Sequence, residues 1–180
     1  MADHELFRFQ SLDQLRSRVQ ELQLNLGISD DITPLFEPLK AGSFTLANRL
    51  VVLPMEGADG QADGSPDELT VRRYRRFAAC GAGLLWMEAT AVVAEGRANP
   101  RQLWLRPSNV AAFAALIGEA LRAGREACGE AHRPLLVVQL THSGRYSRPG
   151  RSPQPIIAHH SPFLYPTHKL PPDYPLISDD

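Results

Sequence analysis

The sequence GAGLLWMEAT, at residues 81–90, decides the fold of this chain. Its centre, from Gly83 to Glu88, is a short apolar run that does not alternate with polar residues. Such a run is typical of a strand with both faces covered. Two further runs share these properties, LVVLP at residues 50–54 and LLVVQL at residues 135–140. We therefore expect three buried strands.

Helical patterns fill the two gaps between these strands. In the first gap, Ser65 and Glu68 form a capping-box pair around Pro66. Apolar residues follow it at helical spacing, namely Val71, Tyr74, Phe77 and Ala78. In the second gap, Ser108 precedes a longer apolar stripe of Phe113, Leu116, Ile117, Ala120 and Leu121. Strands that alternate with helices predict a parallel sheet, with the carboxyl ends of all strands at one edge.

The residues before the first strand predict a helical arm and a hairpin. Ser11 and Gln14 form another capping-box pair, followed by an apolar stripe at Leu12, Leu15, Val19 and Leu22. We expect an amphipathic helix that packs on a larger body, with partner binding as the alternative. Around Gly42, loosely alternating apolar residues predict a short hairpin.

The residues after the third strand lose this periodicity. Prolines recur through residues 147–180, and Ser178 to Asp180 resemble the cap and first turn of a further helix. We interpret this ending as a truncation. The expected organisation is a helical arm at residues 1–33, the first β/α units at residues 34–146 and a proline-rich loop at residues 147–180.

The composition is that of an ordinary globular protein. The chain is 43% hydrophobic and 22% charged with a net charge of −1, so neither nucleic acid nor a membrane is expected as a partner. No signal peptide or membrane span is evident, and we expect a soluble cytoplasmic protein. Cys80 and Cys128 follow no metal or redox spacing and are expected to be buried thiols. A cluster of arginines is interpreted as the solvent face of a helix: Arg72, Arg73, Arg75 and Arg76.

Polar side chains collect where the three strands end. Glu56 follows the first strand, Thr90 follows the second, and the third leads from Gln139 to His142 and Arg145. Ligands of parallel α/β folds bind at this edge, so we expect the functional site there. Any barrel enzyme would show this arrangement.

Three motifs at these strand ends resemble the Old Yellow Enzyme-like NADH:flavin oxidoreductase family. They are NRLVVLPM at residues 48–55, GAGLL with EAT within residues 81–90, and QLTHSGR at residues 139–145. The resemblance implies an α/β fold, an incomplete (β/α)8 TIM barrel in which parallel strands one to three follow the helix and hairpin. It also implies hydride transfer from NAD(P)H through FMN to an activated alkene-type substrate.

The resemblance further implies which residues hold FMN. The backbone around Leu53, Pro54 and Met55 would line the isoalloxazine ring, and Ala89 would lie beneath it. Gln139 would hydrogen-bond the pyrimidine edge of the ring, whose donors and acceptors a neutral amide matches. Taken alone, Gln139 is equally explained as a strand-end amide bonded to neighbouring backbone.

Glu56 departs from the family pattern, although its position places it among the FMN contacts. The family has a threonine or cysteine there, which donates a hydrogen bond to the flavin. A carboxylate cannot donate unless it is protonated, and its charge opposes that of reduced flavin. Either Glu56 turns away or it lowers the flavin potential. Ala58 likewise occupies a position where some members have a substrate-facing tyrosine.

His142 and Arg145 are candidates at the rim of the site. They could position an anion or the flavin, and anchoring of their own loop is the alternative. No metal is expected, because neither cysteine nor regularly spaced carboxylate accompanies the histidines of the tail, His159, His160 and His168.

Much of the family's machinery has no matching motif in this chain. A closed barrel has eight strands and typically ~250 residues. The family's substrate-anchoring pair and proton donor come after the third strand, so the catalytic residues and the small-molecule substrate stay unassigned. One alternative is an amine- or dienoyl-CoA-directed flavoenzyme relative, with an iron–sulfur cluster possible further along the chain. Another is a non-catalytic remnant that serves in association, for instance as a homo-oligomer.

Overall fold

A three-stranded parallel sheet forms the centre of the molecule. The computed structural model describes residues 6–163 and 170–177, so Ser178 to Asp180 and His168 lie outside the described residues. The strands are β3 (Val51–Val52), β4 (Leu84–Ala91) and β5 (Leu135–Thr141), in the order β3-β4-β5. Both pairings are parallel. The predicted parallel sheet is confirmed, although its first strand is shorter than residues 50–54.

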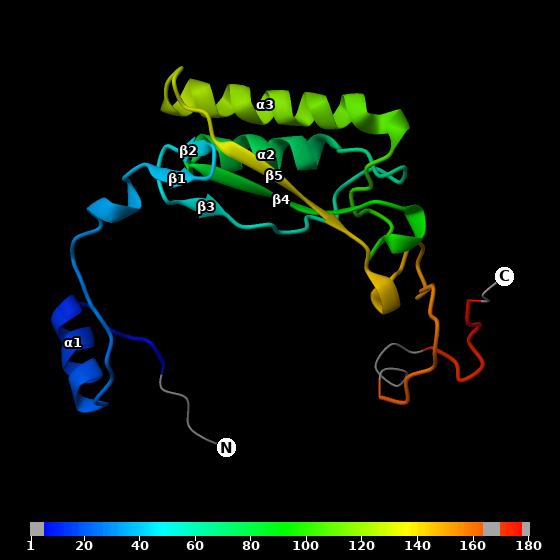
Figure 1. Cartoon of the computed structure of the whole chain (residues 1–180), viewed down its shortest axis with the longest axis horizontal. Coiled ribbons are helices and arrows are strands. Elements are labelled where there is room, and N and C mark those ends of the chain that lie inside the picture. The colour runs from blue at the N-terminus through cyan, green and yellow to red at the C-terminus, as the bar shows by residue number, and fades with distance from the viewer. Residues whose placement is uncertain (1–5, 164–169, 178–180) are drawn as a thin grey trace.

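Two helices cover one face of this sheet (Figure 1). They are α2 (Glu68–Ala79) and α3 (Val110–Cys128), which follow β3 and β4 in the chain. The opposite face is open in the described part of the chain, where Trp86 on β4 is 41% exposed and Leu140 on β5 is 60% exposed. Only one face of each strand therefore contributes to the core in the described residues, and the expectation that both faces of these strands are covered is not met there.

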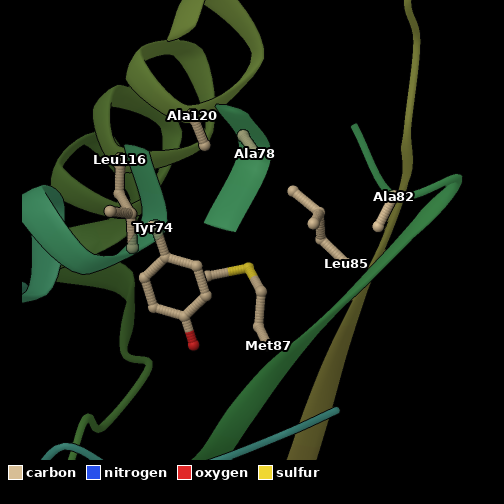
Figure 2. Packing of buried hydrophobic residues seen from close by; sticks show 7 residues of the cluster. All are labelled: Tyr74, Ala78, Ala82, Leu85, Met87, Leu116 and Ala120. Atoms are coloured by element: carbon tan, nitrogen blue, oxygen red, sulfur yellow. The ribbon is translucent and has the colours of Figure 1, made fainter. Parts of the chain in front are cut away.

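The core lies between the sheet and the two helices (Figure 2). Tyr74 of α2 and Met87 of β4 face each other, and each is at most 2% exposed. The remaining members of the buried cluster are Ala78, Ala82, Leu85, Leu116 and Ala120. The apolar positions that the sequence predicts for the helices thus face the sheet, as expected from their spacing.

The predicted start of α2 is wrong by two residues. Its N-cap is Asp67, whose carboxylate accepts a hydrogen bond from the Glu68 N–H, and not Ser65. Ser65 does not act as the cap because its hydroxyl is hydrogen-bonded to Asp63. The Asp63 carboxylate accepts hydrogen bonds from both the N–H and the hydroxyl of Ser65. An Asx turn therefore precedes the helix.

Asn48 joins the first two strands of the sheet at their amino ends. Its Oδ1 accepts hydrogen bonds from the N–H groups of Gly83, at 2.8 Å, and Leu50, at 3.1 Å. Its Nδ2 donates to the carbonyl of Gly81 at 2.7 Å. One side chain therefore satisfies three backbone groups, which gives this position in the sequence motif a structural role.

The residues before the sheet form the expected hairpin and an isolated helix. The hairpin pairs β1 (Leu39–Ala41) with β2 (Phe44–Leu46) in antiparallel fashion around Gly42, whose φ is +62°. Helix α1 (Leu12–Glu21) begins at the Ser11 cap as predicted, but none of its residues is buried. The expected packing of its apolar stripe on a larger body is therefore not found among the described residues.

Both cysteines lie outside the buried core. Cys80 and Cys128 are exposed rather than buried, because they lie at the C-terminal ends of α2 and α3, outside the core.

Across the described ranges, no helix combines the length and apolarity needed to cross a bilayer. Short 3-10 turns complete the connections, at Thr33–Leu35, Ala94–Gly96, Pro107–Asn109 and Gly144–Tyr146.

Candidate functional site

The predicted site residues share the carboxyl edge of the sheet. An irregularity in the β4–β5 ladder lies between Met87, which pairs with Val138, and Thr90, which pairs with Leu140. Two residues of β4, Glu88 and Ala89, therefore lie opposite the single residue Gln139 of β5.

The segment after β3 reaches the same edge. Leu53 and Met55 are each 69% exposed there, and Pro54 between them is half-buried. The Gly57 N–H donates to Oε2 of Glu88 at 3.1 Å, which fixes this segment beside β4. The structure thus brings together the ends of all three strands.

Gln139 has an exposed side-chain amide at this edge. Its side chain is exposed and makes no hydrogen bond within residues 6–163 and 170–177. An amide presents both donors and an acceptor, so it can pair with the edge of a heterocycle.

The carboxylate of Glu56 is engaged by the loop that follows β4. It accepts hydrogen bonds from Nδ2 of Asn99 and Nε2 of Gln102, both at 3.4 Å. Desolvation by burial, together with the nearby charge of Glu88, raises the pKa of Glu56. Glu56 is therefore more readily protonated than an ordinary glutamate.

Gln102 is a buried residue of the site that the sequence did not reveal. It is 1% exposed, and its Nε2 donates to the carbonyl of Ala89 at 3.0 Å as well as to Glu56. Its Oε1 accepts the N–H of Ala98. The loop is thereby tied to the ends of β3 and β4. No spacing rule links position 102 to position 89, so sequence patterns gave no signal for this contact.

A buried ion pair lies directly behind the site. Glu88 is 1% exposed, and its Oε1 accepts hydrogen bonds from Nη2 of Arg73 at 2.8 Å and from the hydroxyl of Tyr74 at 3.2 Å. The Tyr74 hydroxyl also accepts the N–H of Glu88 at 2.7 Å. Met87 packs on the same tyrosine, so two consecutive strand residues reach α2. In a regular strand, consecutive side chains point to opposite faces of the sheet. The irregular pairing after Met87 lets Met87 and Glu88 both reach α2.

Arg73 is a site residue that sequence analysis assigned wrongly to the solvent face. Its Nη2 lies 2.8 Å from both Asp59 Oδ1 and Glu88 Oε1, and its Nη1 donates to the carbonyl of Met55 at 3.2 Å. Burial opposes the charge of Arg73, but the hydrogen bonds to Asp59 and Glu88 raise its pKa above the ordinary value. A buried carboxylate such as Glu88 needs a partner, and this was the signal that could have identified Arg73.

Both rim candidates hold their own loop in place. Nδ1 of His142 accepts the N–H of Gly144 at 2.9 Å. Nη2 of Arg145 donates to the carbonyl of His159 at 2.8 Å and lies 3.0 Å from Nε2 of the same residue. Within the described ranges, no group of three or more His, Cys, Asp or Glu residues is placed to hold a metal ion.

Comparison with known families decides the identity of this arrangement. The model of the NADH:flavin oxidoreductase / NADH oxidase family matches residues 34–163. The chain belongs to this family. The match covers the hairpin, the whole sheet and both covering helices, and it leaves α1 outside.

Several solved structures have a similar fold. The Old Yellow Enzyme homologue from Zymomonas mobilis is 27% identical, with a TM-score of 0.55 over 71% of this chain and 33% of that one. Morphinone reductase is 24% identical, with a TM-score of 0.56 over 72% of this chain and 33% of that one. A complex of 2-naphthoyl-CoA reductase with 2-naphthoyl-CoA is 18% identical, with a TM-score of 0.60 over 72% and 21%.

The chain spans a third or less of the length of these three structures. Its fold is accordingly a partial TIM barrel, in which β3, β4 and β5 are neighbouring strands and the barrel is not closed. The exposed apolar side chains of Leu53 and Met55 and the uncommitted amide of Gln139 suit a flat, partly apolar group such as a flavin. Glu56 is the one member of the set whose chemistry does not suit it.

Proposed function

We propose that this chain supplies the first three strands of the FMN site of a flavin oxidoreductase. In the whole protein, hydride would pass from NAD(P)H through the flavin to an activated alkene-type substrate. The observation that carries the proposal is the meeting of Met55, Ala89 and Gln139 at one sheet edge in a member of this family.

Each residue has a defined part in the proposal. Leu53, Pro54 and Met55 line the ring and exclude water from it, and Ala89 leaves room beneath it because its side chain is small. Gln139 hydrogen-bonds the polar edge and so sets the orientation of the ring. Bound FMN supplies the hydride chemistry, and no residue of this chain is assigned as the proton donor.

We further propose that Glu56 turns away from the flavin instead of contacting it. Its hydrogen bonds with Asn99 and Gln102 support this orientation, because they direct the carboxylate toward the loop after β4. The raised pKa also reduces the charge that Glu56 presents to a reduced flavin. His142 and Arg145 would then shape the rim by holding their loop.

Titration of the purified chain with FMN tests the proposal. We expect quenching of flavin fluorescence, a yellow complex and a stoichiometry of one FMN per chain. The matched control is Gln20→Ala on α1, which leaves the sheet edge untouched. A folded chain that neither quenches nor retains FMN would contradict the proposal and favour the non-catalytic alternative. An amine- or dienoyl-CoA-directed activity, an iron–sulfur cluster and a homo-oligomer stay predictions.

A further inference from the structure

Two residues that the proposed flavin contacts do not include, Arg73 and Glu88, hold the segment after β3. Oε2 of Glu88 accepts the N–H of Gly57 at 3.1 Å, and Nη1 of Arg73 donates to the carbonyl of Met55 at 3.2 Å. The ion pair is therefore hydrogen-bonded to the backbone on both sides of Glu56. Each contact joins groups that are distant in sequence, so only the tertiary fold creates them.

The ion pair is itself held firmly. Nη2 of Arg73 lies 2.8 Å from carboxylate oxygens of both Asp59 and Glu88. The hydroxyl of Thr70 donates to Asp59 at 2.8 Å and fixes that carboxylate in turn. A Cβ placed on Gly57 would lie 2.3 Å from Nη2, so backbone and guanidinium are in direct contact. Charge-assisted hydrogen bonds of this kind are about twice as strong as neutral ones.

We propose that Arg73 and Glu88 are positioning residues that fix the backbone of Met55 to Gly57 in the conformation that receives the flavin. The inference rests on the proposed function. Neither side chain is among the proposed flavin contacts. They act through the carbonyl of Met55 and the N–H of Gly57, and so determine how the adjacent side chains meet the cofactor.

Glu88→Gln is the most direct test, because it changes the hydrogen bonding and keeps the shape. The carboxylate accepts from Arg73 and Tyr74 at one oxygen and from Gly57 at the other. An amide has only one oxygen, so its NH2 group must face either the Gly57 N–H or the donors of Arg73 and Tyr74. Either orientation removes part of the link between the ion pair and the loop.

Two further variants separate positioning from stability. Tyr74→Phe removes a buried hydroxyl from the same carboxylate but leaves the contacts with Met55 and Gly57 in place. Tyr74→Phe therefore shows the effect of destabilising the network when the contacts with the loop are kept. Arg73→Lys keeps the positive charge but lacks the planar fork that reaches Asp59, Glu88 and Met55 together.

The full chain is measured both without and with FMN. In the flavin-free state, amide hydrogen exchange is followed at residues 55–60 and compared with exchange in β4. We expect Glu88→Gln and Arg73→Lys to speed exchange in the loop about tenfold, and Tyr74→Phe to leave it near the wild-type rate. With FMN, we expect both loop variants to weaken binding about tenfold and to shift the visible spectrum of the saturated complex, unlike Tyr74→Phe.

The outcomes are distinguishable. The inference is overturned if Glu88→Gln and Arg73→Lys change neither loop exchange nor the flavin spectrum, or if Tyr74→Phe changes both equally. A wild-type chain that binds no FMN overturns the proposed function. In that case faster loop exchange in Glu88→Gln still supports the loop-fixing role, and unchanged exchange overturns that role as well.

Discussion

The backbone N–H of Gly57 donates a hydrogen bond to the buried carboxylate of Glu88 at 3.1 Å, across 31 residues of sequence. The contact connects the loop after β3 to the middle strand of the sheet. It needs a residue without a side chain at position 57, because a Cβ there would meet Arg73 Nη2 at 2.3 Å and Asp59 Oδ2 at 2.6 Å. Both atoms belong to the same ion-pair network and cannot move aside freely.

The first prediction concerns this close contact. We expect Gly57→Ala to lower the free energy of unfolding by about 1–3 kcal/mol, because the added methyl group strains a packed network. Urea denaturation measures the change. Gly118→Ala is the matched control, since Gly118 lies within α3 and nothing lies within 4 Å of its added Cβ. It should stabilise the chain by about 0.5–1 kcal/mol. Equal effects of both substitutions would contradict the crowding at Gly57.

The second prediction concerns the clamp between β3 and β4. Asn48→Ala leaves the N–H of Gly83, the N–H of Leu50 and the carbonyl of Gly81 without their partner. We expect a loss of about 1–3 kcal/mol in unfolding free energy. The neighbouring Arg49 makes an exposed ion pair with Glu37, so Arg49→Ala should cost less than about 1 kcal/mol. The clamp would be disproved if Arg49→Ala were as harmful as Asn48→Ala.

The third prediction compares two leucines. Leu85 in β4 is 1% exposed within the core cluster, and Leu85→Ala should cost about 2–5 kcal/mol. Leu69 in α2 is 46% exposed, so Leu69→Ala should change stability by about 0.5 kcal/mol or less. Chemical denaturation of both variants checks the assignment of the covered sheet face. A small effect at Leu85 would mean that this face is not the core.

The fourth prediction uses the raised pKa of Glu56. Because the folded chain holds this proton more tightly than the unfolded chain, its contribution to stability is present at low pH and is lost as pH rises through the folded pKa. As pH rises above about 4, the unfolding free energy of the wild type should therefore fall relative to that of Glu56→Gln. Asp59 and Asp63 have lowered pKa values but are present in both proteins. Their contributions therefore cancel when the two unfolding free energies are subtracted. Urea midpoints across the pH range give this difference, and a constant value would refute the shift.

The fifth prediction concerns Gln139. Its exposed amide makes no hydrogen bond within the described ranges, so Gln139→Ala should leave the unfolding free energy within about 0.5 kcal/mol of wild type. If it pairs with the flavin edge as proposed, FMN affinity should fall about tenfold. Fluorescence titration measures the affinity, with Gln20→Ala on α1 as the control. An unchanged affinity would remove Gln139 from the proposed site.

The arrangement of strands and helices could be predicted because it depends on local patterns. The stripes that became α2 and α3 have a period that matches their burial, and the apolar runs that became β4 and β5 predicted strands at the right places. The cover expected on both faces of these strands is not found in the described residues, because β5 has no buried residue there. The start of α2 could not be predicted from its capping motif, because Asp63 competes for Ser65 through a turn that precedes the helix. The packing of α1 could not be predicted, because an apolar stripe specifies a face of the helix and not the surface that covers it.

The residues at the strand ends were predictable, but the network behind them was not. Parallel strands bring Met55, Ala89 and Gln139 to one edge wherever such a sheet forms. Arg73 was placed wrongly, because on sequence alone it is one of several arginines on a helix. Its inward position depends on an irregular register in β4 that directs Glu88 toward the helix, and no local pattern encodes that irregularity.

The loop between β4 and α3 is hydrogen-bonded to the segment after β3 and to the end of β4. Arg97, 5% exposed, donates to the carbonyls of Ala62, Pro100 and Gln102, while Leu105 and Ala91 are joined through their backbones. Moving this loop away from the segment after β3 would break the hydrogen bond between Arg97 and the carbonyl of Ala62 and the one between Gln102 and Glu56. The position of this loop is therefore set by the same contacts that orient the carboxylate of Glu56.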